Sequence, residues 1–192
     1  MKLKDLSTKE RIISATIDLI MENKEVNQIP ISSIAERAGV GIGLINYHFQ
    51  TKENLINQCV QQVIGKLFGS FEEVSANLTG LQPADKLKSL IQFIAAFMAE
   101  NRELARISTL TDLSNGKEND NSSYMMKTYY PFIKEAFQGN RSEKEQKVIL
   151  LALISTIQVT FLRSDINDIS GFDFFDPDQR NEFLEILVDL LK

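Results

Sequence analysis

The sequence predicts an all-α protein of about nine helices, and three observations support this. Nearly every readable segment repeats its apolar residues with the 3.6-residue period of an α-helix. No segment shows sustained alternation flanked by hairpin turn pairs, the pattern that indicates β-strands. The chain of 192 residues is 43% apolar and 24% charged, which suits a protein with a sizeable core and excludes collagen-like and wholly disordered chains.

The N-terminal region predicts one longer helix followed by two short ones. The first helix begins at Ser7, because Ser7-Thr8-Lys9-Glu10 has the form of a capping box. Its apolar stripe consists of Ile12, Ile13, Thr16, Leu19 and Ile20. A short helix follows Pro30 and runs to about Ala38, and another covers about Ile42–Phe49. Gly39 suits the left-handed conformation that ends a helix, so these two helices are expected to meet at a tight turn.

Further helical segments fill the rest of the chain. They are expected from Lys52 to about Phe71, from Pro83 through Met98, from Asn101 to Leu113, from Tyr124 to Phe137, from Ser142 to about Arg163, and from Asp176 to Lys192. Thr51, Ser142 and Asp176 are candidate N-caps. Residues 114–123 are expected to form a polar loop, and Pro131 is expected to kink or divide its helix.

The composition argues against several functional classes. A single cysteine, Cys59, excludes an intramolecular disulfide framework, and a single histidine, His48, leaves little basis for a metal site or a histidine-centred relay. Residues 1–11 carry charge and lack the apolar core of a signal peptide. The apolar stretch Val148–Leu162 is too short to span a bilayer. The prediction is a soluble, cytoplasmic protein without a metal, a cofactor or catalytic residues.

Charge is unevenly distributed along the chain. The net charge is −5, which by itself argues against a nucleic-acid partner. Residues 1–66, however, carry eight basic and seven acidic side chains, so the remaining residues hold a net charge of −6. A nearly neutral N-terminal region on an acidic body permits DNA binding through that region, but it only weakly suggests it.

The segment 31–49 carries the most functional information. Two short helices around a glycine turn have the geometry of a helix-turn-helix, whose second helix enters the major groove of DNA. The apolar residues expected to hold the two helices together are Ile31, Ile34, Ala35, Ala38, Val40, Ile45 and Phe49. The residues left to face outward are Ser32, Ser33, Gly41, Ile42, Gly43, Leu44, Asn46, Tyr47 and His48.

Residues Thr8 to Ile56 resemble the DNA-binding domain of the TetR family of bacterial transcriptional regulators. The shared features, in order, are a first helix, Ile-Ala-x-x-Ala-Gly-Val, a Gly-x-x recognition helix, His-Phe and Thr-Lys-Glu-Asn-Leu. The resemblance implies a helix-turn-helix DNA-binding domain over residues 1–51, and a helical ligand-binding and dimerisation domain over residues 52–192. It further implies that the outward residues above, together with Lys52, contact double-stranded operator DNA.

Individual contacts follow from the chemistry of the side chains. Lys52 lies in the first turn of its helix, where its charge opposes the helix dipole unless a phosphate is bound; the alternative is a merely solvated lysine. Tyr47 and His48 match positions that the family uses on phosphate, although His48 would also serve to pack beside Phe49. Asn46 stands where the family usually has tyrosine, and asparagine can bond adenine bidentately or donate to phosphate.

The helix over Val148–Leu162 is apolar around most of its circumference, and the last helix also has a wide apolar face. A helix on the surface of a monomer needs only one apolar stripe, so both helices are expected to pair with those of a second copy. The predicted dimerisation residues are Ile149, Leu153, Ile157, Phe183, Leu187 and Leu190. The alternative is that these helices form the centre of a monomeric body.

The body also contains many aromatic residues, most of them expected to be core. Some are candidates to line an apolar ligand pocket with polar anchors. The candidate residues are Phe97, Arg102, Arg106, Tyr129, Phe132, Gln158 and Phe161.

Together these features predict a homodimeric repressor that a small-molecule ligand releases from DNA. Two other classes remain open. One is a helical protein-interaction module without DNA binding. The other is a small helical enzyme, although the sequence shows no clustered nucleophile, base and orienting group.

Overall fold

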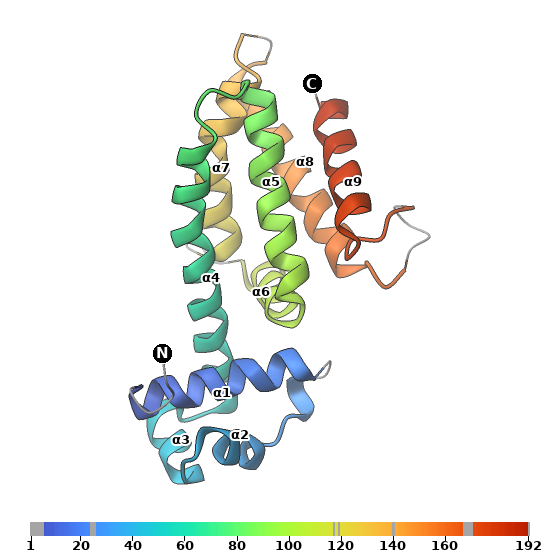
Figure 1. The fold of residues 1–192 in the computed structure, drawn as a ribbon. Coiled ribbons are helices and arrows are strands. Elements are labelled where there is room, and N and C mark those ends of the chain that lie inside the picture. Colours follow the sequence, from blue (N-terminus) through green and yellow to red (C-terminus); the bar gives the residue numbers. More distant parts are fainter. Residues whose placement is uncertain are drawn as a thin grey trace. The chain divides into compact units, whose positions relative to one another are not determined.

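The computed structural model describes residues 6–23, 26–116, 118, 120–139, 141–166 and 171–191. Within those ranges the chain contains nine α-helices, one short 3₁₀ helix and no β-strand (Figure 1). The all-α prediction is therefore confirmed. The chain divides into two compact units, one formed by residues 1–66 and 101–107, the other by residues 67–100 and 108–192.

The first unit is built on the three N-terminal helices. They are α1 (Thr8–Glu22), α2 (Ile31–Ala38) and α3 (Ile42–Phe49), with the 3₁₀ helix η2 (Val26–Gln28) between α1 and α2. The capping box of α1 is present: the Glu10 N–H donates to Ser7 Oγ at 3.3 Å, and the Ser7 N–H donates to the Glu10 carboxylate at 2.8 Å. The predicted apolar stripe of α1 is fully buried, and this helix contacts both α2 and α3.

Helix α4 (Lys52–Asn77) supplies the remaining wall of the first unit. The Cys59 thiol lies inside this unit and donates to the Ile13 carbonyl oxygen at 3.8 Å. Leu55 is also completely buried, which explains why the first compact unit continues past residue 51 and reaches Lys66. The Asn54 N–H donates to Thr51 Oγ1 at 3.1 Å, so the predicted N-cap of α4 is confirmed.

The second unit is a helical bundle. Helix α5 (Pro83–Glu100) contacts α7 (Asn121–Ala136), α8 (Glu143–Leu162) and α9 (Pro177–Leu191), and α8 contacts both α7 and α9 (Figure 1). Buried Tyr129 ties two of these helices together, because its hydroxyl donates to the Leu90 carbonyl oxygen at 3.0 Å. The most deeply buried large side chains of this unit are Leu87, Leu90, Ile133, Leu153, Phe174 and Leu184.

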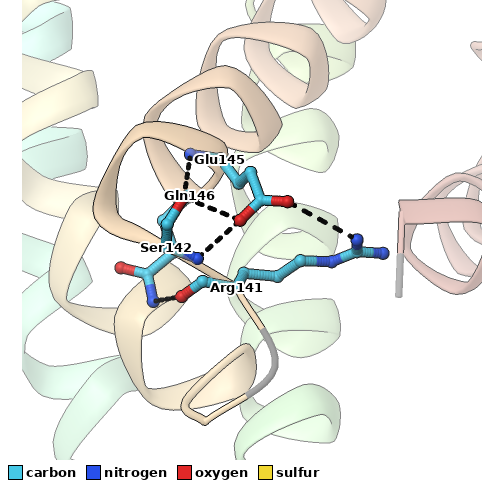
Figure 2. A network of polar contacts seen from close by, with 4 residues as sticks. All are labelled: Arg141, Ser142, Glu145 and Gln146. Atoms are coloured by element: carbon cyan, nitrogen blue, oxygen red, sulfur yellow. Dashed lines mark hydrogen bonds and ion pairs between the residues drawn. The ribbon is translucent and has the colours of Figure 1, made fainter.

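Helix α8 begins at a well-defined polar cap (Figure 2). Ser142 and Glu145 form the predicted capping box, with the Ser142 N–H donating to Glu145 Oε2 at 2.7 Å and the Glu145 N–H donating to Ser142 Oγ at 3.3 Å. The buried Gln146 amide donates to the Arg141 carbonyl oxygen at 3.2 Å, which fixes the chain just before the helix. The cap satisfies donors that a helix start otherwise leaves without partners.

Helix α8 is 20 residues long, five more than the apolar stretch considered in the sequence. By length and composition alone it could cross a membrane. However, it packs against α7 and α9, and it buries Ile149, Leu153 and Phe161 within the bundle. These contacts identify α8 as a core helix of the second unit.

Several helix ends differ from the prediction. Helix α4 runs to Asn77, six residues beyond the expected end near Phe71. Helix α6 (Arg102–Asn115) extends two residues past the predicted Leu113, and α7 begins at Asn121, so both take residues from the expected polar loop. Asp120 causes the early start of α7, because its carboxylate caps the helix by accepting from the Ser123 N–H at 2.7 Å.

Pro131 lies inside α7, and the helix continues through it to Ala136. Of the two outcomes expected for Pro131, a divided helix is wrong, while a kink stays a prediction. Buried neighbours on both sides, Tyr129 and Ile133, hold the segment against the bundle and compensate for the missing N–H donor. Asp176 caps α9 as predicted, accepting from the Gln179 N–H at 2.9 Å, although the Gln179 side chain accepts from the Asp173 N–H instead. The predicted last residue, Lys192, lies outside the described residues.

The burial of Cys59 leads to a test of the first unit. Burial raises the pKa of the Cys59 thiol to about 12, and the side chain is 0% exposed. Because the thiolate is the reactive species, iodoacetamide at pH 8 should modify the native chain about 100-fold more slowly than the chain unfolded in guanidinium. The rate is measured by mass spectrometry of timed samples. Equal rates for the native and unfolded chains would show that this core is open.

Candidate functional site

Helices α2 and α3 meet at a turn that two backbone hydrogen bonds close. Gly39 adopts φ +64°, and its N–H donates to the Glu36 carbonyl oxygen at 3.1 Å. The Val40 N–H donates to the Ala35 carbonyl oxygen at 3.0 Å. A residue with a side chain is strained at this φ, so glycine allows the abrupt end of α2 that the sequence predicted.

The inner surface of this helix pair follows most of the sequence prediction. The buried residues are Ile34, Ala35, Ala38, Ile45 and Phe49. Two residues expected in the core, Ile31 and Val40, are only half-buried. Ile31 is the first residue of α2 and Val40 lies in the turn, so neither is covered on all sides by neighbouring helices.

The outer surface of α3 is exposed. Seven of the predicted DNA-contacting residues are exposed: Ser32, Gly41, Ile42, Gly43, Leu44, Asn46 and Tyr47. Three are half-buried: Ser33, His48 and Lys52. The most exposed large side chain of the group is Tyr47, at 78%, with Ile42 at 47% and Leu44 at 43%. This short helix therefore presents three large side chains, Ile42, Leu44 and Tyr47, to solvent.

His48 packs between two aromatic rings of its own helix. Its ring centroid lies 5.2 Å from that of Tyr47 and 6.1 Å from that of Phe49, both in edge-on geometry. This packing orients the imidazole at the end of α3 and leaves it partly accessible. Within the described residues, no group of three or more histidine, cysteine, aspartate or glutamate side chains could hold a metal ion.

A strained turn connects α3 to α4. Gln50 has φ +59° and ψ −44°, and the next N–H, that of Thr51, donates to the Phe49 carbonyl oxygen at 2.7 Å. These angles are those of a γ-turn with positive φ, a conformation that costs a non-glycine residue about 1–3 kcal/mol. This turn was not predicted, since glutamine has no preference for it.

One basic group of the first unit is occupied by an ion pair. The Arg37 guanidinium makes two hydrogen bonds to the Glu22 carboxylate, at 2.8 and 2.7 Å. This hydrogen bonding lowers the pKa of Glu22 and raises the pKa of Arg37. The pair joins α1 to α2, and sequence reasoning missed it because the partners are 15 residues apart. Arg37 is therefore less available to DNA than the charge count suggests.

The second unit contains a groove between α4 and α7 with a volume of about 430 Å³. Its lining consists of Phe68, Phe71, Glu72, Ser75, Ala76, Tyr124, Thr128 and Phe132. Of the seven predicted ligand residues, Phe132 is the one in this lining. Sequence reasoning missed the five α4 residues of the lining because it treated α4 as a connecting helix.

Three further predicted ligand residues lie outside this lining and make contacts within the chain. Tyr129 is buried and donates to Leu90, and Phe161 is buried with its ring centroid 5.5 Å from that of Phe174. The Gln158 amide donates to Ser122 Oγ at 3.0 Å. Of the remaining candidates, Arg102 and Arg106 belong to the first compact unit and Phe97 is half-buried in α5.

The predicted dimerisation residues differ from one another in solvent exposure. Ile149, Leu153 and Ile157 are buried within a single chain, so the chain's own helices already cover them. Phe183 and Leu187 are half-buried, and Leu190 is 79% exposed. The exposed apolar residues of these two helices are Val148, Leu151, Val159, Ile186 and Leu190.

Comparison with known proteins finds a family that the first unit resembles. Residues 12–59 match the family model described as "Bacterial regulatory proteins, tetR family". An HTH-type transcriptional regulator of Staphylococcus aureus is 26% identical over 91 residues, and the match spans 47% of this chain and 48% of that protein. An uncharacterised HTH-type transcriptional regulator of Haemophilus influenzae is 27% identical over 183 residues, 94% of this chain and 91% of the relative.

The fold of the whole chain is also similar to solved structures. One is Thermus thermophilus FadR, described as a TetR family transcriptional repressor in complex with lauroyl-CoA. It superimposes with a TM-score of 0.62 at 21% identity, over 95% of this chain and 92% of that one. The family match covers the helix-turn-helix, and the fold similarity covers both units. The first unit is thus similar to the TetR family of bacterial regulatory proteins, and the whole chain shares its fold with a solved repressor described as a member of that family.

Proposed function

We propose that this protein is a homodimeric, cytoplasmic repressor that reads operator DNA with α3 of each subunit and is released by a small-molecule ligand. Regulators of this family act by binding and not by catalysis. The exposed outer face of α3 carries the proposal. It presents Ile42, Leu44 and Tyr47 to solvent while the opposite face of the helix is buried.

The chemistry of that face suits the major groove of DNA. Ile42 and Leu44 can contact thymine methyl groups, and Asn46 can pair with adenine or donate to phosphate. Gly41 and Gly43 add no side chain, and a Cβ at either position would meet open space, so the backbone at the start of α3 can approach DNA closely. Tyr47, partly exposed His48 and Lys52 then supply contacts to phosphate.

The exposed apolar residues of α8 and α9 support a dimer. Val148, Leu151 and Val159 lie on one side of α8, while Ile186 and Leu190 lie on one side of α9. These two helices contact each other within the chain, so their exposed residues can form one continuous surface. A second copy using the same surface would bury it by two-fold symmetry and form a four-helix interface. Two-fold symmetry also gives two recognition helices for a palindromic operator.

The ligand-binding part of the proposal depends on the second unit. The groove between α4 and α7 has a volume in the range of small-molecule sites. A related repressor, the FadR described above, was solved with lauroyl-CoA bound. Binding in the groove would shift DNA affinity only if the ligand prefers one arrangement of the dimer over the other.

Asn46 tests base reading by α3. Replacing Asn46 by Ala should change the preferred operator and cost about tenfold in affinity for the wild-type operator, since one amide pair to a base is lost. Sequencing of fragments selected from a random DNA library measures the preference. Asn57→Ala, the same substitution at an exposed position on α4, is the control and should leave the selected sequence unchanged. An equal loss of affinity on every sequence would contradict base reading.

Lys52 tests phosphate binding. Replacing Lys52 by Ala should weaken binding to all DNA sequences and reduce the slope of log K against log salt by about one per subunit, because one phosphate contact is lost. Fluorescence anisotropy between 50 and 200 mM salt gives the slope. Lys66→Ala, at an exposed position further along the same helix, should leave it unchanged. If both variants retain the wild-type slope, Lys52 does not contact phosphate.

Leu151 tests the dimer surface. Its side chain is 52% exposed in one chain, so Leu151→Glu should leave the protomer folded but bury an unpaired carboxylate at the symmetric interface. The dimer dissociation constant should rise about 100-fold. Analytical ultracentrifugation measures it, with Leu113→Glu as the control, since Leu113 is 58% exposed on α6. A monomeric wild-type protein, or equal effects of both substitutions, would reject this surface.

A further inference from the structure

The groove between α4 and α7 owes its shape to the spacing of residues on the two helices. Phe68, Phe71, Glu72, Ser75 and Ala76 repeat at intervals of three, one, three and one, which places them on one face of α4. The residues that α7 contributes repeat every four positions: Tyr124, Thr128 and Phe132. Small residues near the C-terminal end of α4 leave open volume, while aromatic rings form the walls.

Four aromatic rings surround that volume. The Phe68 and Tyr124 ring centroids are 4.1 Å apart, and those of Phe71 and Phe132 are 5.9 Å apart in edge-on geometry. The face of an aromatic ring carries partial negative charge and attracts cations. The Phe132 ring already attracts a cation in this chain, because the Lys86 ammonium lies 5.2 Å from its centroid.

The lining itself carries only acidic charge, and the Lys86 ammonium beside the Phe132 ring lies 3.9 Å from the Glu135 carboxylate. Glu72 is the single charged residue of the lining, and within the described residues it forms no ion pair. Ser75 and Ala76 lie in the last turn of α4, which contains no basic residue. The C-terminal end of a helix carries partial negative charge, so it adds to the field of the Glu72 carboxylate. An anionic ligand would meet no basic side chain in the lining.

We propose that this groove binds a small organic cation with an apolar body, such as an aryl or alkyl quaternary ammonium ion. The rings would cover the apolar body and face the cationic head, and Glu72 would balance its charge. This proposal depends on the proposed function in one respect: it takes the cation to be the ligand that regulates DNA binding. The proposed ligand also differs from that of the FadR above, because lauroyl-CoA carries phosphates.

Two probes of equal shape test the role of charge. Phenyltrimethylammonium is cationic, and tert-butylbenzene replaces its nitrogen by carbon and is neutral. Ligand-observed NMR titration of the full chain should show the cation binding at least about tenfold more tightly than the neutral probe. Glu72→Gln should weaken binding of the cation about fivefold to tenfold and leave the neutral probe within twofold.

Two further variants check the site. Glu73→Gln removes the same charge from the next residue, which is exposed like Glu72 but lies outside the lining, and should change cation affinity less than twofold. Tyr124→Leu keeps an apolar side chain at a position that is 49% exposed but removes one ring, and it should weaken cation binding about threefold or more. Circular dichroism confirms that each variant is folded.

Equal binding of both probes, or equal effects of Glu72→Gln and Glu73→Gln, would overturn the assignment. DNA binding is measured by anisotropy on the same preparations, so that failure of one proposal can be told from failure of the other. A protein that binds DNA but not the cation would refute the groove assignment alone. A protein that binds the cation through Glu72 but ignores DNA would refute the proposed function alone.

Discussion

The DNA-binding unit depends on one small apolar core. Helices α2 and α3 are eight residues each, too short to be stable alone in water. They persist because Ile34, Ile45 and Phe49 are almost completely buried, and α1 contacts both helices. Burying each of these side chains is worth about 1.5–3 kcal/mol. The same burial decides which residues of α3 point outward, so the core determines the chemistry that the surface offers.

Local signals in the sequence predicted several helix ends correctly. The capping boxes of α1 and α8, the Gly39 turn and the Thr51 cap each act over three or four residues, and all four are present. For the same reason, the bounds of α3 could be predicted from its own residues. Features that join distant residues were not predicted. The Arg37–Glu22 pair and the groove between α4 and α7 depend on how helices pack, and periodicity within one helix does not contain that information.

Helix α8 shows the limit of periodicity most clearly. Its apolar residues surround most of the helix, so the sequence predicted two covered sides, but the residues that it placed on the dimer side, Ile149, Leu153 and Ile157, are buried by the chain itself. Packing against α7 and α9 buries Ile149 and Leu153 and leaves Val148 and Leu151 in solvent. Pro131 failed as a helix breaker for a related reason. Buried neighbours stabilised α7 by more than the proline destabilised it.

The connection between α3 and α4 is only two residues long, Gln50 and Thr51, and it has almost no freedom to absorb motion. Gln50 continues the hydrogen bonding of α3 through its N–H to the Asn46 carbonyl oxygen at 3.0 Å, while Thr51 caps α4. If the first turns of α4 rotate, the tilt of α3 must therefore change as well. The torsion angles of a single glutamine thus act as a rigid coupling between the two helices. A variant with glycine there would loosen the coupling while leaving every exposed side chain of α3 in place.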